Sequence, residues 1–153
     1  ILSGEFEFDV IFGPAYKGIP LAAAVSTSLS MQTSRPIPFA FDRKEEKSHG
    51  EGGNIVGEVK DKKVLILDDV LTAGTALKQS MEIISNAGGK ITGCMVALDR
   101  EEIFDQITAR DKISKEFDLE ITSIARISQL IDFFDLSGRK DEAKVIRNYL
   151  SNL

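Results

Sequence analysis

Apolar residues occur along the chain in short runs that alternate between strand and helix patterns. Runs rich in β-branched and aromatic residues predict five strands, which are Phe8–Phe12, Ile37–Phe41, Val64–Leu67, Ile91–Leu98 and Leu119–Ile124. Helical spacing predicts helices over Ile19–Met31, Thr75 to the Gly88-Gly89 pair, Asp105–Phe117, Ile127–Leu136 and Asp141–Leu150. Because near-continuous apolar strands alternate with helices, the pattern indicates an α/β fold with a mostly parallel central sheet flanked by helices.

Composition narrows the class of protein. The 153 residues are 42% hydrophobic and 28% charged, which predicts a single globular domain over residues 1–153. A net charge of -5 argues against a general surface for polyanions, although a local basic cluster can still hold a small phosphorylated ligand, so nucleic acid is not an expected partner. The one cysteine, Cys94, lies in an apolar run and is expected in the core of a protein from a reducing compartment. No apolar run approaches the roughly 20 residues of a membrane span, so we expect a cytoplasmic enzyme or binding protein without a membrane partner.

The segment "VLILDDVLTAGT" places two adjacent carboxylates at the predicted end of a buried strand. Asp68 and Asp69 are followed by Thr72–Thr75 and then by a helix, so backbone N–H groups and two hydroxyls can converge on an anion at the helix N-terminus. A phosphate fits such a cup, and the carboxylates can accept hydrogen bonds from vicinal sugar hydroxyls or hold a divalent cation. The alternative is that the two aspartates only form a turn and a helix cap.

Three further segments carry charged residues that can meet the same ligand. In "FGPAYKGIP", Tyr16 and Lys17 project from a glycine-punctuated turn after the first strand, although a turn lysine is commonly just solvated. Arg43–Gly57 reads as a long mobile loop in which glycines allow closure as a lid, against the alternative of a solvated charge run. Arg100, in "ALDREE", follows the fourth strand and can bind a carboxylate with two hydrogen bonds, or form a salt bridge to a neighbouring glutamate, Glu101 or Glu102.

These motifs together resemble the type I phosphoribosyltransferases, which have a Rossmann-like fold. The order and spacing of "FGPAYKGIP", "RKEEKSHGEGGN", "VLILDDVLTAGTA" and "LDREE" resemble the orotate enzymes of this family most closely. The resemblance runs from about Phe8 into the final helix. It implies Mg²⁺-dependent transfer of phosphoribose from phosphoribosyl pyrophosphate to orotate, with orotidine 5-phosphate and pyrophosphate as products, in the synthesis of UMP.

The resemblance also implies a role for each motif residue. Asp68 and Asp69 would bind the ribose 2- and 3-hydroxyls, and Thr72 and Arg100 would bind orotate. The 5-phosphate would be held by Val70, Leu71, Thr72, Ala73, Gly74, Thr75 and Ala76. Tyr16 and Lys17 would flank the pyrophosphate, and the mobile catalytic loop at about 43–57 would add Arg43, Lys44, Lys47 and His49. The residues implied in catalysis are Lys44, Lys47, His49, Asp68 and Asp69.

Other implications concern the assembly and the metal. The resemblance implies a homodimer whose loops reach into the neighbouring site, and Mg²⁺ held mainly through the substrate, with no direct protein ligand beyond an indirect role for Asp68 and Asp69. Family members carry an N-terminal segment ahead of the strand that comes first here, and this chain is expected to lack it. Two alternatives stay open: a phosphoribosyltransferase for another base, and a regulator that binds phosphoribosyl pyrophosphate without catalysis.

Overall fold

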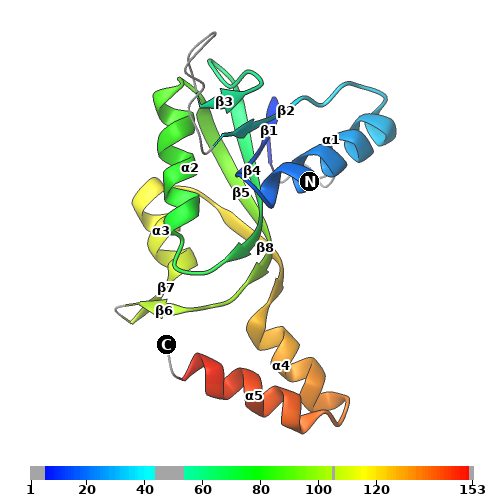
Figure 1. Cartoon of the computed structure of the whole chain (residues 1–153), viewed down its shortest axis with the longest axis vertical. Helices are drawn as coiled ribbons and strands as arrows, with labels where there is room; N and C mark the ends of the chain where they lie inside the picture. Colours follow the sequence, from blue (N-terminus) through cyan, green and yellow to red (C-terminus); the bar gives the residue numbers. More distant parts are fainter. Residues whose placement is uncertain (1–5, 44–53, 105, 152–153) are drawn as a thin grey trace.

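A mixed six-stranded sheet forms the centre of the computed structural model, which describes residues 6–43, 54–104 and 106–151 (Figure 1). The strand order is β3-β2-β1-β4-β5-β8, and every neighbouring pair is parallel except β2 and β3. The strands are β1 (Val10–Gly13), β2 (Phe39–Asp42), β3 (Ile55–Val56), β4 (Lys63–Leu71), β5 (Lys90–Asp99) and β8 (Ile121–Arg126). The predicted α/β fold with a mostly parallel sheet is confirmed.

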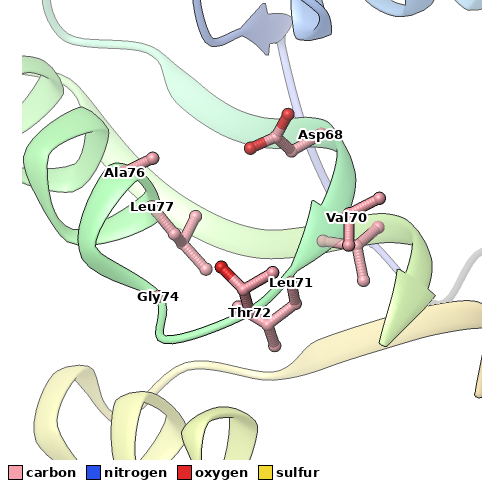
Figure 2. Close-up of a pocket in the computed structure, with 8 residues that line it drawn as sticks. Asp68, Val70, Leu71, Thr72, Gly74, Ala76 and Leu77 are labelled. Carbon is pink, nitrogen blue, oxygen red and sulfur yellow. The ribbon is translucent and has the colours of Figure 1, made fainter. Parts of the chain in front are cut away.

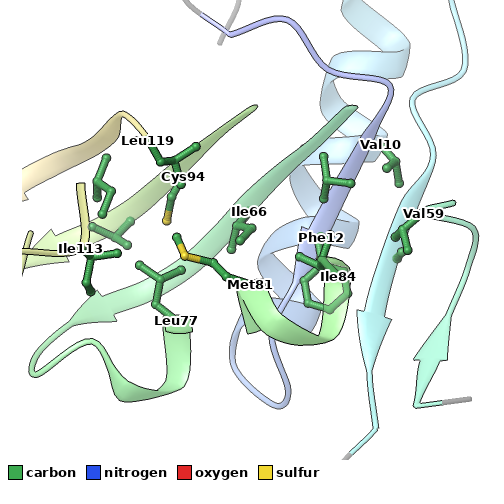
Figure 3. Packing of buried hydrophobic residues seen from close by; sticks show 14 of the residues in the cluster. Val10, Phe12, Val59, Ile66, Leu77, Met81, Ile84, Cys94, Ile113 and Leu119 are labelled. Carbon is green, nitrogen blue, oxygen red and sulfur yellow. The ribbon is translucent and has the colours of Figure 1, made fainter. Parts of the chain in front are cut away.

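Helices cover both faces of this sheet, as Figure 1 shows. The helices are α1 (Gly18–Thr33), α2 (Thr75–Asn86), α3 (Ala109–Phe117), α4 (Ile127–Leu136) and α5 (Lys140–Leu150). One buried cluster joins the sheet to α1. Another joins the opposite face of the sheet to α2 and α3, and Figure 3 shows this second cluster. The sheet is therefore the middle of three layers.

The period-2 alternation of β4 builds both clusters at once. Val64 and Ile66 belong to the cluster with α2, whereas Leu65 and Leu67 belong to the cluster with α1. All four residues are buried because both faces of the strand are covered, which explains the uninterrupted apolar run. Cys94 on β5 is fully buried beside them, as predicted.

The acidic pair lies inside β4, which corrects the predicted strand Val64–Leu67. β4 continues to Leu71 because β5 keeps pairing with it, up to the register Leu71↔Asp99. On its other side, β1 pairs with β4 only as far as Ile66. Asp68 and Asp69 thus lie on a part of β4 that pairs with β5 but no longer with β1. An otherwise buried strand can carry charge there.

Two other predictions of secondary structure are corrected. The helix predicted from Asp105 begins at Ala109, because Ile103–Phe104 (β6) and Ile107–Thr108 (β7) form a small antiparallel hairpin before it. Thr108 caps the helix by accepting a hydrogen bond from the Asp111 N–H at 3.1 Å. In the long loop predicted at 43–57, Ile55–Val56 forms the edge strand β3.

Helices α4 and α5 form a pair that follows β8 and lies beyond the layers covering the sheet (Figure 1). An ion pair between Arg147 on α5 and Asp135 on α4 joins the two helices. Their predicted ranges are confirmed, with α5 one residue longer than expected. Within the described residues, no helix is long and apolar enough to cross a membrane.

Candidate active site

The turn between β1 and α1 is compact because two glycines face each other. A Cβ on Gly13 would lie 2.3 Å from the Gly18 carbonyl oxygen, and a Cβ on Gly18 would lie 2.9 Å from the Leu67 carbonyl oxygen. Only residues without a side chain allow this approach of α1 to β4. The turn exposes Tyr16 and Lys17 above the carboxyl end of the sheet.

Lys17 connects this turn to the acidic pair. Its Nζ lies 2.9 Å from Asp69 Oδ2, although the lysine side chain is 78% exposed. The contact raises the pKa of Lys17, mainly through the hydrogen bond to Asp69. The predicted pyrophosphate residue and the predicted ribose residue therefore meet directly in the structure.

The two aspartates differ in how readily they take up a proton. Burial, followed by the neighbouring Asp69, raises the pKa of Asp68 to about 6, although its Oδ1 accepts the Asp69 N–H at 2.8 Å. Burial also acts to raise the pKa of Asp69, but the ion pair with Lys17 outweighs it and the pKa lies below the ordinary value. Asp69 is thus the firmly ionised member, and Asp68 takes up a proton first as pH falls.

The turn from Leu71 into α2 forms the hollow beside Asp68 (Figure 2). A small pocket of about 30 Å³ there is lined by Asp68, Val70, Leu71, Thr72, Gly74, Ala76, Leu77 and Val96. The N-cap of α2 is Gly74 at φ 79°, so no side chain caps the helix, and its first turn carries no acidic residue. The N–H groups at this helix end are therefore placed for an anion such as phosphate.

Arg100 lies at the same edge of the sheet, next to this turn. Its backbone N–H donates to the Leu71 carbonyl at 3.1 Å, which places it beside Thr72. Its guanidinium forms a salt bridge with Glu102, Nη2 to Oε1 at 2.9 Å. Of the two glutamates considered from the sequence, Glu102 is thus the partner, and Arg100 stands beside the phosphate cup rather than inside it.

Arg43 follows β2 on the other side of the β1–α1 turn. Its N–H donates to the Asn54 carbonyl at 2.7 Å, and it lines a cavity of about 460 Å³ together with Pro14, Ala15, Asp42, Asn54, Ala76, Gln79, Ser80 and Ile83. Lys44, Lys47 and His49, the other residues predicted in the mobile catalytic loop, lie outside the described residues. The structure therefore places the base of this loop next to the β1–α1 turn.

Sequence reasoning missed two residues that order this edge, Asp42 and Tyr149. Asp42 Oδ1 accepts the Ala15 N–H at 2.7 Å and so ties the β1–α1 turn to the end of β2. Glu102, only 7% exposed, holds Arg100 through a salt bridge. The ring of Tyr149 on α5 stacks on the Arg100 guanidinium. The position of Asp42 at a strand's carboxyl end was a usable signal, whereas the contact of Tyr149 depends on how α5 packs.

The fold and this group of residues are typical of proteins that bind phosphate groups at the carboxyl ends of parallel strands. The family model "Phosphoribosyl transferase domain" matches residues 1–127. Two curated relatives are the orotate phosphoribosyltransferase of Kluyveromyces lactis, 44% identical over 97% of this chain and 70% of its own length, and that of Marinobacter nauticus, 49% identical over 87% and 63%. The crystal structure of the orotate phosphoribosyltransferase from Francisella tularensis superimposes with a TM-score of 0.79 at 35% identity, covering 97% of this chain and 73% of the other. The chain belongs to the orotate phosphoribosyltransferase family.

Proposed function

We propose that this protein transfers phosphoribose from phosphoribosyl pyrophosphate to orotate, giving orotidine 5-phosphate and pyrophosphate in the synthesis of UMP. The observation that carries the proposal is the meeting of three groups at one sheet edge. These are the Asp68–Asp69 pair with Lys17, the uncapped N-terminus of α2, and Arg100 bonded to Leu71. Together they match a sugar with hydroxyls, a phosphate and a carboxylate-bearing base.

The donor is held by its three chemically different parts. Backbone N–H groups over 70–76, with the hydroxyls of Thr72 and Thr75, bind the 5-phosphate at the positive end of the α2 dipole. Asp68 and Asp69 accept hydrogen bonds from the ribose 2- and 3-hydroxyls. Lys17 then lies close enough to Asp69 to face both the ribose and the pyrophosphate, with Tyr16 beside it.

Catalysis follows from where charge develops. Breaking the anomeric C–O bond places negative charge on the departing pyrophosphate and positive charge on the ribose ring. Cations already in place around the leaving group stabilise that transition state more than the ground state. Lys17 and Arg43 from the described residues, with Lys44 and Lys47, supply this charge, and His49 donates a hydrogen bond or proton to the departing phosphate. Closure of the loop excludes the water that would hydrolyse the donor.

Mg²⁺ is part of the proposed reaction and is held mainly by the substrate. Among the described residues, no group of three or more His, Cys, Asp or Glu side chains is placed to hold a metal ion. Of the two carboxylates at the site, Asp69 is already paired with Lys17. The hard oxygen atoms of pyrophosphate and ribose suit Mg²⁺, which keeps several waters and takes few protein ligands. The ion would neutralise part of the pyrophosphate charge.

Orotate is placed beside Thr72, with its carboxylate on Arg100. A guanidinium binds a planar carboxylate through two parallel hydrogen bonds, and purines or uracil offer no such group. Arg100 therefore favours orotate over another base. We also propose a cytoplasmic homodimer in which each loop reaches into the neighbouring site. The likeness of "RKEEKSHGEGGN" to the family's loop supports the dimer, and the buried, unpaired Cys94 suits a reducing compartment.

The alternative of a regulator that binds the donor without catalysis makes a different prediction for Lys47. A sensor needs the phosphate cup and the aspartates, but it needs no cation on a leaving group. We expect Lys47→Ala to lower the rate of orotidine 5-phosphate formation on the order of 10²–10³-fold, with donor affinity by calorimetry changed much less. Unchanged turnover in this variant would remove the catalytic role of the loop, and a wild-type protein that binds the donor without turnover would favour the sensor.

A further inference from the structure

Arg100 is held from two directions. At the edge of its guanidinium, Nη2 lies 2.9 Å from Glu102 Oε1. At its face, Cζ lies 4.8 Å from the centre of the Tyr149 ring, which belongs to α5 near the end of the described chain. The arginine side chain is consequently only 27% exposed, although it directly follows the carboxyl end of β5.

The turn that carries Arg100 is itself rigid. Asp99, 1% exposed, accepts the Glu101 N–H at 2.9 Å and holds Glu101 at a φ of 49°. Glu102 is nearly buried, and its carbonyl accepts the Ala109 N–H at the start of α3 at 3.1 Å. The backbone on both sides of the Arg100 side chain is therefore fixed by the core, and the aromatic ring comes from a separate element.

The same turn anchors the helix pair that brings the ring. Glu101 Oε2 accepts the Ser128 N–H at 2.9 Å in the first turn of α4. Helix α5 then joins α4 through the ion pair of Arg147 with Asp135. Tyr149 thus reaches Arg100 through a continuous series of contacts that begins at the turn after β5 and returns to it.

We propose that Tyr149 positions the Arg100 guanidinium for the carboxylate of the base, so that α5 forms part of the orotate subsite. This inference rests on the proposed function. A guanidinium offers five N–H donors in one plane, and Glu102 takes one edge of it, so a second carboxylate can be bound at another edge. A ring stacked on the face leaves this plane in place and restricts the rotamers of a long side chain.

The test separates binding of the base from the other steps of the reaction. We expect Tyr149→Ala and Tyr149→Leu to raise the KM for orotate about 3–10-fold, the range of a partly exposed cation–π contact. The kcat and the KM for phosphoribosyl pyrophosphate should stay within about twofold, since the Tyr149 ring lies over the arginine proposed to bind the base. Inhibition by uracil, which has the ring of orotate without its carboxylate, should not change.

Two variants serve as controls. Tyr149→Phe keeps the ring and should behave like wild type. Val145→Ala shortens an exposed side chain one turn earlier on α5 and should also leave the KM for orotate unchanged. Tyr149→Leu keeps apolar volume on the helix, so it remains informative if the alanine variant unfolds.

A wild-type KM for orotate in Tyr149→Leu, or an equal weakening of inhibition by uracil, would overturn the inference alone. Absence of orotate transfer by the wild-type protein would overturn the proposed function and this inference together.

Discussion

Asp68 carries a carboxyl group whose ionisation is opposed by the fold. Its pKa is raised to about 6 from an ordinary 3.8, chiefly by burial. A raised carboxyl pKa means that the folded state holds the proton more tightly than the unfolded state does. Ionisation therefore lowers stability, by an amount that is absent below about pH 4, grows as pH rises and is complete above about pH 6.

Replacing Asp68 by asparagine should therefore stabilise the protein at neutral pH. The Asn Oδ1 can still accept the Asp69 N–H, so only the charge is lost. Because the carboxyl is partly exposed and screened, we expect a gain of about 1 kcal/mol in the free energy of unfolding at pH 7.5. Urea denaturation at pH 7.5 and pH 5 measures it, and the gain should shrink at the lower pH. A gain of equal size at both values would contradict the charge argument.

The same variant should lose function while it gains stability. In asparagine the second carboxylate oxygen becomes an NH2 group, which cannot accept a hydrogen bond from a ribose hydroxyl, so donor affinity and transfer should both fall. Stability sacrificed at a binding residue is the usual mark of a functional site. If Asp68→Asn were more stable and fully active, the assignment of Asp68 to the ribose would be wrong.

At the scale of elements, the junction of β4 and α2 depends on Gly74. Its φ is 79°, and a Cβ there would lie 2.1 Å from Ile113 Cδ1 on α3. Gly138, between α4 and α5, has a similar φ of 77° but nothing within 4 Å of a Cβ. A side chain at either glycine would strain the backbone, but only at Gly74 would it also clash with the core. Comparing the two positions therefore separates these two costs.

We expect Gly74→Ala to lose about 2–3 kcal/mol of unfolding free energy, since it combines an unfavourable φ with overpacking. Gly138→Ala should lose about 1 kcal/mol, from backbone strain alone. Chemical denaturation of both variants provides the comparison, and donor binding should fall only for Gly74→Ala, because the phosphate turn must shift. Equal losses of stability would show that Ile113 yields without cost.

The elements that the sequence predicted well are those defined by periodicity alone. The helix Ile127–Leu136 has the predicted range. On α2, the residues Leu77, Met81 and Ile84 all face the hydrophobic core. The β6–β7 hairpin before α3 was missed, because its strands are only two residues long and the apolar residues also suit a helix. The length of β4 was missed because pairing with β5, rather than apolar content, decides where it ends.

In the candidate site, too, local motifs could be predicted from the sequence, whereas features that depend on packing could not. Lys17, Asp68, Asp69 and the Thr72–Thr75 turn were predicted and do lie together, because each motif occupies the carboxyl end of a strand or the turn after it. The opposite pKa shifts of the two aspartates depend on burial and on Lys17, and the sequence shows neither. The contact of Tyr149 with Arg100 requires the packing of α5, which periodicity does not determine.

At the scale of the whole molecule, the proposed sharing of loops between subunits can be tested by mixing two inactive variants. Lys47→Ala lacks a loop residue and Asp68→Asn lacks a ribose residue. In a mixed dimer with exchanged loops, one site carries both defects and the other carries none. Equal mixing after subunit exchange should therefore restore about a quarter of the wild-type transfer activity. Activity no greater than that of the separate variants would show that each loop serves its own site.

The central claim is that the site joins phosphoribose to orotate, and a panel of bases tests it most directly. Nucleotide formation is measured with Mg²⁺, phosphoribosyl pyrophosphate and, separately, orotate, uracil, hypoxanthine and adenine. The account predicts orotidine 5-phosphate from orotate and no product from the other three, because only orotate offers Arg100 a carboxylate. Product from uracil or a purine in place of orotate, or donor binding without product from any base, would contradict it.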